Sequence, residues 1–229
     1  MTARITGSGS ALPAPMDQQR LWDGFFREHY NDARLARKVW QHSGITTRRG
    51  VVDPTVEDIS TWGTGARMQR FLAEAMPLGK EAVSEALADA GVDPADVGLL
   101  TVVSCTGYVT PGLDILLARD LGMTPAVQRL HIGHMGCYAA IPGLASTADA
   151  VAARGRTAVM LCLELTSLHV QPPTEDAEQV VVEGQMAGDV FEAKHILVKC
   201  PSKYNDGREF ERAEPGVRPG VPTAQASLR

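Results

Sequence analysis

Apolar and amphipathic segments alternate regularly through the middle of the chain. Residues 80–91 (KEAVSEALADAG) carry apolar side chains at helical spacing and end at a glycine, which is typical of a helix terminus. Residues 97–105 (VGLLTVVSC) form a continuous apolar run rich in β-branched side chains, too uniform for a half-exposed strand. The pattern predicts a helix that leads into a strand buried on both faces.

This unit recurs twice further along the chain. An amphipathic helix is predicted over residues 114–122 and a strand over 128–136, and then a helix over 141–155 and a strand over 157–165. Helices that alternate with buried strands build a mostly parallel sheet with helices on both faces. The fold class predicted by the pattern is therefore α/β.

The segments that precede this region have a different pattern. Residues 4–13 (RITGSGSALP) predict a short strand that runs into a Gly/Pro turn. Residues 17–42 place aromatic and aliphatic side chains at helical spacing. We expect one or two helices there, near an entrance.

The character of the sequence changes again after about Asp176. The segment EQVVVEGQMAGDVFEAKHILVKC still contains strand-like stretches, whereas the Pro/Gly/Arg-rich end has almost no large apolar residue. We therefore predict three parts: a domain over residues 1–180, a divergent β-rich segment over 181–205, and a disordered tail over 206–229.

Composition narrows the classes of protein. The 229 residues are 44% hydrophobic and 21% charged with a formal net charge of -5, so the chain can bury one sizeable core. The Lys and Arg residues are scattered and form no basic field for a nucleic acid. No apolar leader follows Arg4, and no apolar run reaches the length of a membrane span. We expect no nucleic-acid or membrane partner and a cytoplasmic location.

The four cysteines have to be interpreted one by one. Cys105, Cys137, Cys162 and Cys200 form no CxxC pair, so the spacing predicts neither a zinc site nor a disulfide framework. Cys162 lies inside the apolar run VMLCLEL and is expected to pack as a small hydrophobe.

Cys137 stands between a predicted strand and a predicted helix, and could be a buried spacer, a metal ligand or a nucleophile. At a helix N-terminus, unpaired N–H groups and the helix dipole favour a thiolate and could bind the oxyanion formed when a thioester carbonyl is attacked. Pro142 predicts a kink or a late start of this helix. Cysteine is most often a small buried hydrophobe, so position and spacing alone leave the alternatives open.

Five segments, in order, add a resemblance to a known family. SGSALP, GITTRR, VVSCTGYVTPGLD, MGCYAAIPGL and LCLELTSLHVQPPT resemble the N-terminal half of a type III polyketide synthase of the chalcone/stilbene synthase family, over roughly residues 3–180. The resemblance implies one half of a thiolase-like fold, in which two αβ halves form an αβαβα arrangement, and a homodimer. It also implies that coenzyme A thioesters are substrates, with no bound cofactor and no metal.

The resemblance makes Cys137 the nucleophile. Cys137 would take an acyl group from an acyl-CoA starter and pass it to a carbanion made by decarboxylating malonyl-CoA, before the chain cyclises. Cys105, Thr166 and His169 would line the acyl cavity, and Thr110 would reach across the dimer into the partner's cavity. An ordinary β-turn role for Thr110 stays open.

Further roles follow from the resemblance for charged residues. Glu164 would be a buried structural carboxylate under the active site, which needs partners that the sequence does not name. Arg34, Arg37 and Lys38 would bind the phosphates of coenzyme A, or form a solvated helix face. His131 and His134 flank Cys137, but the family places its catalytic His elsewhere, so both are expected to be structural or pocket-lining.

Two departures from the family leave alternatives open. The catalytic His and Asn of the family lie in a C-terminal half that the 229 residues do not contain. The segment VEGQMAGDVFEAKHILVKCPSKYND is similar to the end of the small β-barrel haem chaperone of cytochrome c maturation, in which a CxxxY motif, here Cys200 and Tyr204, attaches haem. The alternatives are an inactive fragment that acts only by oligomerisation, and a fusion with a haem-binding tail.

Overall fold

A computed structural model describes residues 2–170, 180–187 and 190–198 of the chain. The chain divides into two compact units, Met1–Pro173 and Thr174–Arg229. The predicted disordered tail lies outside the described residues, and so do Cys200 and Tyr204.

A three-stranded parallel sheet forms the centre of the first unit. Its strands are β3 (Val97–Val103), β4 (Gln128–Ile132) and β5 (Thr157–Cys162), in the order β4-β3-β5. All seven residues of β3 are buried, as expected for a central strand covered on both faces. The predicted strands and their parallel arrangement are confirmed.

The register aligns the carboxyl ends of the three strands. Val103, the last residue of β3, pairs with Ile132 on one side and with Cys162 on the other. The segments that follow the three strands therefore leave the sheet along the same edge. Chemistry-bearing residues placed just beyond the strands can meet there.

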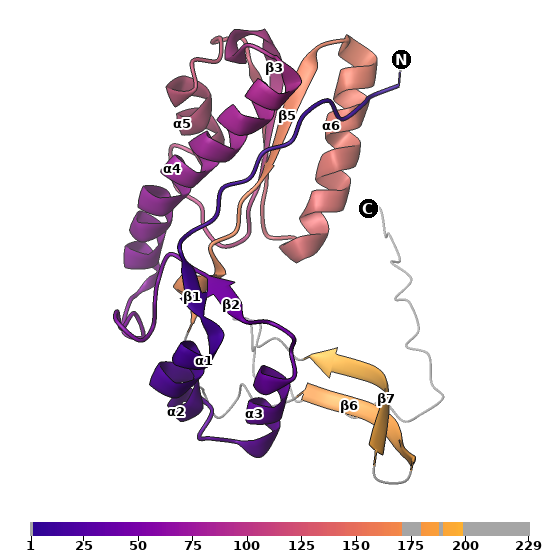
Figure 1. Cartoon of the computed structure of the whole chain (residues 1–229). Helices are drawn as coiled ribbons and strands as arrows, with labels where there is room; N and C mark the ends of the chain where they lie inside the picture. Colours follow the sequence, from indigo (N-terminus) through magenta and orange to yellow (C-terminus); the bar gives the residue numbers. More distant parts are fainter. Residues whose placement is uncertain (1, 171–179, 188–189, 199–229) are drawn as a thin grey trace, which may run out of the picture. The chain divides into compact units, whose positions relative to one another are not determined.

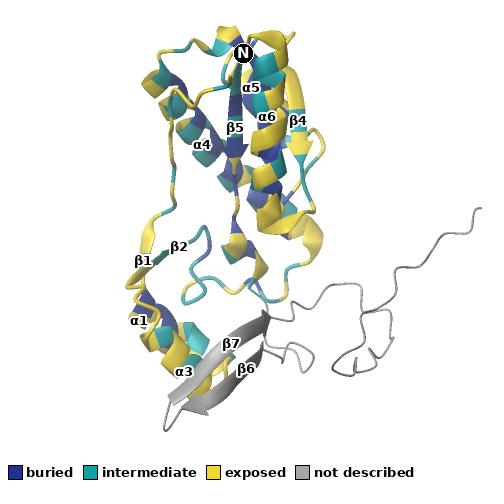
Figure 2. Cartoon of the chain, turned by 90° about the vertical axis from the view of Figure 1, so that its right-hand side faces the viewer, coloured by how far each residue is buried: buried dark blue, intermediate teal, exposed yellow. Residues whose placement is uncertain are grey.

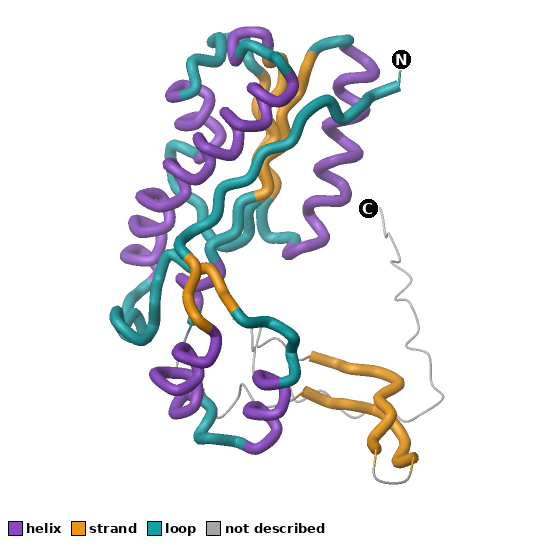
Figure 3. Tube along the Cα trace, viewed as in Figure 1, coloured by secondary structure: helices purple, strands orange, loops and turns teal. Residues whose placement is uncertain are grey.

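Helices cover both faces of this sheet, which confirms the predicted layering (Figure 1). The helices α4 (Thr64–Ala90) and α5 (Leu113–Asp120) pack together on one face, where α4 lies against β5 and α5 against β3 and β4. The helix α6 (Ala140–Arg154) packs on the opposite face, against β3 and β5. Figure 3 shows the strands between these helices.

The helix α4 is longer than the sequence predicted. It begins at Thr64 rather than near residue 80, and Pro77 and Gly79, which favour a break in isolation, lie inside it. Tertiary packing outweighs these signals because Gly79 allows α4 to approach Leu117 and Leu161 closely. The buried residues of α4 recur every four positions: Arg67, Phe71, Ala75, Gly79, Val83 and Leu87.

The N-terminal segment corrects a prediction. Residues 4–13 form no strand; they run extended beside α4, where the backbone N–H groups of Ser8 and Ser10 donate to Asp89 (2.9 Å) and Glu85 (2.7 Å). A Cβ atom at Gly7 or Gly9 would lie 2.5 or 2.2 Å from a carbonyl oxygen of α4. The glycines therefore permit contact with a helix, rather than the turn that the sequence suggested.

A smaller substructure follows this segment. Aromatic rings pack on one another there. The ring centroid of Trp40 lies 5.5 Å from that of Trp22 and 4.7 Å from that of Phe26. The helices predicted within residues 17–42 are confirmed. The elements are β1 (Pro15–Asp17), α1 (Gln18–Leu21), a π-helical turn (Trp22–Phe26), α2 (Arg27–His29), α3 (Arg34–Gln41) and β2 (Thr47–Arg49), with β1 and β2 antiparallel.

The second unit contains two antiparallel strands, β6 (Val180–Ala187) and β7 (Val190–Val198). They confirm the strand-like stretches predicted after Asp176. The predicted division at residues 180 and 205 stays a prediction.

No helix in the described ranges is long and apolar enough to span a membrane.

Arg67 is a buried cation whose partners are all backbone carbonyls. The side chain is 5% exposed, and its guanidinium donates to the oxygens of Trp62 (2.9 Å), Ile59 (2.8 Å) and Leu168. These contacts join the start of α4 to the loop before it and to the segment that follows β5. A planar guanidinium with five N–H donors can serve three acceptors at once, which a lysine cannot do in the same geometry.

We predict that Arg67→Met lowers the free energy of unfolding by about 3 kcal/mol, because three carbonyls in a protected site lose a charged donor. Arg67→Lys is expected to recover only part of this loss. Urea unfolding followed by circular dichroism measures the change, with Arg4→Met as a control at an exposed arginine. Equal midpoints for Arg67→Met and Arg4→Met would contradict this role of Arg67.

Candidate active site

The candidate site is built on the edge where the parallel strands end. Thr101 of β3 lies 2.8 Å from Thr147 of α6 (Oγ1 to Oγ1), and Val103 packs against Gly143 of the same helix. Cys105, two residues beyond the end of β3, lies with its sulfur against Gly136, in the turn that leads into α6. The same helix begins just after Cys137.

Cys137 lies in a 3-10 turn, Gly136–Ala139, that continues into α6. The α-helix starts at Ala140 and Pro142 lies in its first turn, which confirms the predicted late start. The thiol is free and the residue is exposed, so the interpretation of Cys137 as a buried spacer is wrong for this chain. Within the residues that the structure describes, no group of three His, Cys, Asp or Glu side chains could hold a metal ion.

Cys105 contacts the turn that carries Cys137. The Gly136 N–H donates to the Cys105 sulfur at 3.1 Å, and this sulfur also lies 3.7 Å from the Gly136 carbonyl oxygen. Cys105 is exposed and its thiol is free. The structure thus places Cys105 against the residue that directly precedes Cys137.

The partners of Glu164 are now identified. Its carboxylate accepts hydrogen bonds from the backbone N–H groups of Cys105 (2.9 Å) and Thr106 (3.0 Å) and from the Thr106 hydroxyl (2.6 Å). The prediction of a buried carboxylate is wrong for this chain, because Glu164 is exposed. Its role as a structural carboxylate at this edge agrees with the contacts, which join the segments beyond β3 and β5.

Thr106 is a site residue that sequence reasoning missed. Its hydroxyl accepts from the Leu165 N–H (2.8 Å), and its carbonyl accepts from His169 Nε2–H (2.6 Å). His169 ends a 3-10 turn, Thr166–His169, that also carries the exposed Thr166. The signal available in the sequence was its position next to Cys105 in the CTG motif.

The two histidines near Cys137 have no contact with its thiol among the described hydrogen bonds. His134 has a left-handed backbone (φ 60°) and packs edge-to-face on Tyr108, with ring centroids 5.4 Å apart. His131 is exposed on β4. The expectation that both are structural or pocket-lining stays a prediction.

The other predicted site residues lie elsewhere in the first unit. Thr110 is exposed in the loop between β3 and α5, before a cis peptide bond to Pro111. Arg34, Arg37 and Lys38 lie on α3. The Arg37 Nε–H donates to Asp32 (3.1 Å), and this hydrogen bond is the main reason that the pKa of the Asp32 carboxyl is lowered.

The prediction that Cys162 packs as a small hydrophobe in the core is wrong for this chain. The residue is exposed, because alternation along β5 places Leu161 and Leu163 in the core and Cys162 on the other face. Partial burial of the thiol, and secondarily the negative charge of Glu164, raise the pKa of Cys162 above its ordinary value.

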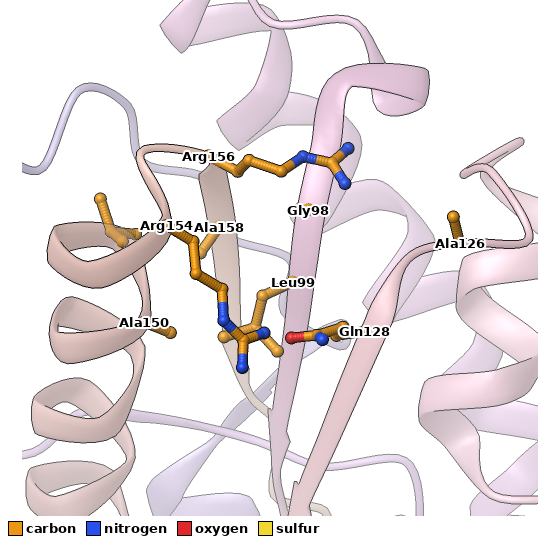
Figure 4. Close-up of a pocket in the computed structure, with 9 residues that line it drawn as sticks. Gly98, Leu99, Ala126, Gln128, Ala150, Arg154, Arg156 and Ala158 are labelled. Carbon is orange, nitrogen blue, oxygen red and sulfur yellow. The ribbon is translucent and has the colours of Figure 1, made fainter.

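A cavity of about 100 Å³ lies where β3, β4 and β5 begin, at the far end of the sheet from Cys105 (Figure 4). Arg154 and Arg156 border it, with Gln128 opposite. None of the predicted site residues lines this cavity.

The sequence of this chain matches a known family. Residues 2–198 match chalcone and stilbene synthases, N-terminal domain. The chain therefore belongs to the chalcone and stilbene synthase family. Because the match extends through β6 and β7 to residue 198, it covers most of the segment in which the haem-chaperone resemblance was seen, and that resemblance has no support.

Several curated proteins are similar to parts of the chain. Alpha-pyrone synthesis polyketide synthase-like Pks18 of Mycobacterium tuberculosis is 33% identical over 138 residues, covering 58% of this chain and 35% of the relative. A 3,5-dihydroxyphenylacetyl-CoA synthase of Streptomyces toyocaensis is 33% identical over 168 residues, covering 72% and 42%. The chain thus spans less than half the length of these relatives.

Solved structures agree with the fold. The C-terminal type III polyketide synthase domain of Steely1 from Dictyostelium has a TM-score of 0.70 at 26% identity, covering 76% of this chain and 51% of that chain. The 1,3,6,8-tetrahydroxynaphthalene synthase of Streptomyces coelicolor has a TM-score of 0.68 at 24% identity, covering 75% and 50%. The predicted fold, one half of a thiolase-like arrangement, is confirmed.

We predict that Glu164→Gln lowers the free energy of unfolding by about 1–2 kcal/mol and exposes the loop after β3 to exchange. A glutamine amide keeps one acceptor oxygen but replaces the other with an NH2 group, which cannot accept from these donors, and it loses the charge that strengthens the hydrogen bonds. Hydrogen exchange at the Cys105 and Thr106 amides measures the change, and Glu81→Gln on the exposed side of α4 is the matched control. Unchanged protection of both amides would show that the carboxylate does not hold this loop.

We also predict that alkylation of Cys162 by iodoacetamide has a pH midpoint above 9.0, the ordinary value for a thiol, because its pKa is raised. Reactivity needs the thiolate, so Cys162 reacts slowly at neutral pH and faster as the pH rises. Glu164→Gln removes a negative charge and is expected to lower the midpoint. Peptide mapping at a series of pH values gives both midpoints, and a Cys162 midpoint below 9.0 would be the contrary result.

Proposed function

We propose that this chain provides the nucleophile-bearing part of a type III polyketide synthase. The observation that carries the proposal is the exposed Cys137 thiol at the entry to α6, beside Cys105 and the segments joined by Glu164. The polyketide synthases among the relatives support the same class of chemistry.

The proposed reaction has two steps at one sulfur. The Cys137 thiolate attacks the carbonyl carbon of an acyl-CoA, a carbon–sulfur bond forms, and coenzyme A leaves as its thiolate. Decarboxylation of malonyl-CoA then gives a carbanion that attacks the Cys137 thioester, and the Cys137 thiolate leaves. Splitting acyl transfer in this way lets one site extend the same chain repeatedly.

The side chains proposed to line the acyl cavity lie at the same edge of the sheet. The Glu164 carboxylate holds Cys105 by accepting from its backbone N–H, and His169 donates to the Thr106 carbonyl. Thr166 lies on the same turn as His169. We assign these three side chains to the substrate cavity, and Thr110 to a contact with the partner in a homodimer.

The helix α3 is the proposed coenzyme A contact. Arg34 and Lys38 are exposed and four residues apart, so they share one face of α3. Arg37 already pairs with Asp32, so a phosphate would have to compete with this carboxylate. Arg34 and Lys38 are therefore the stronger phosphate ligands of the three. The substrates make a cytoplasmic location the natural one for this chemistry.

One observation favours a second function, oligomerisation without catalysis. The face of α6 that points away from the sheet is exposed, with Ile141 66% and Leu144 48% exposed (Figure 2). Apolar side chains at i and i+3 on one helix form a surface that another protein layer can cover. A chain that only docks there would not be acylated. The haem-binding alternative for Cys200 and Tyr204 rests on no described residue.

We predict that incubation with an acyl-CoA adds one acyl mass to the chain, and that the adduct is absent in Cys137→Ala. Intact mass spectrometry with short and long acyl-CoA thioesters measures the reaction and shows which chain lengths load. Cys162→Ala is the matched control and is expected to load normally. An adduct that survives in Cys137→Ala, or a folded chain that forms none, would overturn the nucleophile role.

A further inference from the structure

We propose that Cys137 is a site of reversible oxidation and that Cys105 is its resolving partner, so that the two thiols form a disulfide in the presence of a peroxide. The inference concerns the same site as the proposed function, but formation of the disulfide does not depend on acyl transfer.

The contact between Cys105 and Gly136 carries the proposal. The Cys105 sulfur lies 3.1 Å from the Gly136 nitrogen, and Gly136 precedes Cys137 directly. Because consecutive Cα atoms are about 3.8 Å apart, the Cys137 Cα lies at most about 8 Å from this sulfur. Both thiols are free and exposed, so a peroxide can reach either one.

The backbone around Cys137 can supply the remaining movement. A disulfide needs the two Cα atoms about 4.4–6.8 Å apart, whereas the limit of about 8 Å runs from the Cys105 sulfur rather than its Cα, so Cys137 has to move toward Cys105 before the bond can form. Residues 133–135, which begin with a glycine, connect β4 to the 3-10 turn that contains Cys137 and are held by no strand pairing. Cys105 is fixed from the other side, because its N–H donates to Glu164. A shift of Cys137 toward Cys105 closes the pair.

Cys162 is the less suitable partner for either thiol. It is the last residue of β5 and its backbone is paired with Val103, so it cannot move without breaking the sheet. Burial and the Glu164 charge also raise its pKa, which leaves less thiolate at neutral pH. Cys105 in the loop after β3 and Cys137 in the turn before α6 are therefore selected over the cysteine in a strand.

The chemistry balances with hydrogen peroxide as the oxidant. The Cys137 thiolate attacks one peroxide oxygen; a sulfur–oxygen bond forms, the oxygen–oxygen bond breaks, and hydroxide leaves, which gives a sulfenic acid. The Cys105 thiolate then attacks this sulfur, the sulfur–sulfur bond forms, and hydroxide leaves. Two thiols and one peroxide yield one disulfide and two waters, and a dithiol reductant reverses the change.

Two consequences follow for the site. Capture of the sulfenic acid by Cys105 prevents its further oxidation to sulfinic acid, which is not readily reversed. If Cys137 is the acyl acceptor, the disulfide also stops acyl loading until it is reduced. This second consequence rests on the proposed function, whereas the first does not.

The test is peroxide treatment of the full chain followed by intact mass and peptide mapping without reduction. We expect a loss of two mass units and a peptide pair that links Cys105 to Cys137, both reversed by dithiothreitol. In Cys105→Ser, whose hydroxyl can still accept from Gly136, we expect no link and a gain of 32 mass units at Cys137. Cys162→Ser should behave as the unaltered chain does.

Other outcomes overturn the inference. Oxidation of Cys137 to sulfinic acid in the unaltered chain, at the rate seen in Cys105→Ser, would show that Cys105 does not resolve it. A link from Cys137 to Cys162 or Cys200 would assign the role to another thiol. Acyl loading of the reduced chain is measured in parallel. If the chain does not load but peroxide still links Cys105 to Cys137, only the proposed function is rejected.

Discussion

The Glu164 carboxylate accepts hydrogen bonds from Cys105 and Thr106, the second and third residues after β3, although it belongs to the segment that follows β5. It joins these two segments, which Thr106 also connects through the Leu165 N–H and His169. Thr106, one of these two residues, passes the constraint on to His169, and Cys105 passes it to the turn that carries Cys137. The Glu164 carboxylate and Thr106 together hold the edge on which the candidate chemistry stands.

The sheet and its helices explain why this edge exists. Parallel strands in register end together, and α6 seats closely on the sheet because Gly143 has no side chain, with Val103 and Met160 both 3.1 Å from where a Cβ would be. Arg67 anchors the opposite layer, since it connects α4 to the Leu168 carbonyl beyond β5. Arg67 and Glu164 both bind backbone groups of other segments. The position of Cys137 therefore depends on the fold more than on the residues next to it.

The sequence predicted the parts of this structure that are determined by local features of the chain. The buried strand β3, the Gly91 and Gly155 helix ends and the late start of α6 follow from periodicity, left-handed glycines and Pro142. It failed where tertiary contacts outweigh local signals: Pro77 and Gly79 lie inside α4, and Gly7 and Gly9 lie against it. The exposure of Glu164 and the role of Thr106 depend on which segments meet at the sheet edge, and the exposure of Cys162 depends on which face of β5 is covered. Periodicity carries no information about such long-range contacts.

The central claim is that the fold of this chain presents Cys137 as an acyl acceptor on an edge held by Glu164. A crystal structure of the chain after reaction with an acyl-CoA tests it most directly. The account predicts continuous density from the Cys137 sulfur to an acyl carbonyl, with the Glu164 carboxylate still accepting from the Cys105 and Thr106 amides. Acyl density on another side chain, or an acylated Cys137 with Glu164 turned away from the loop after β3, would contradict it.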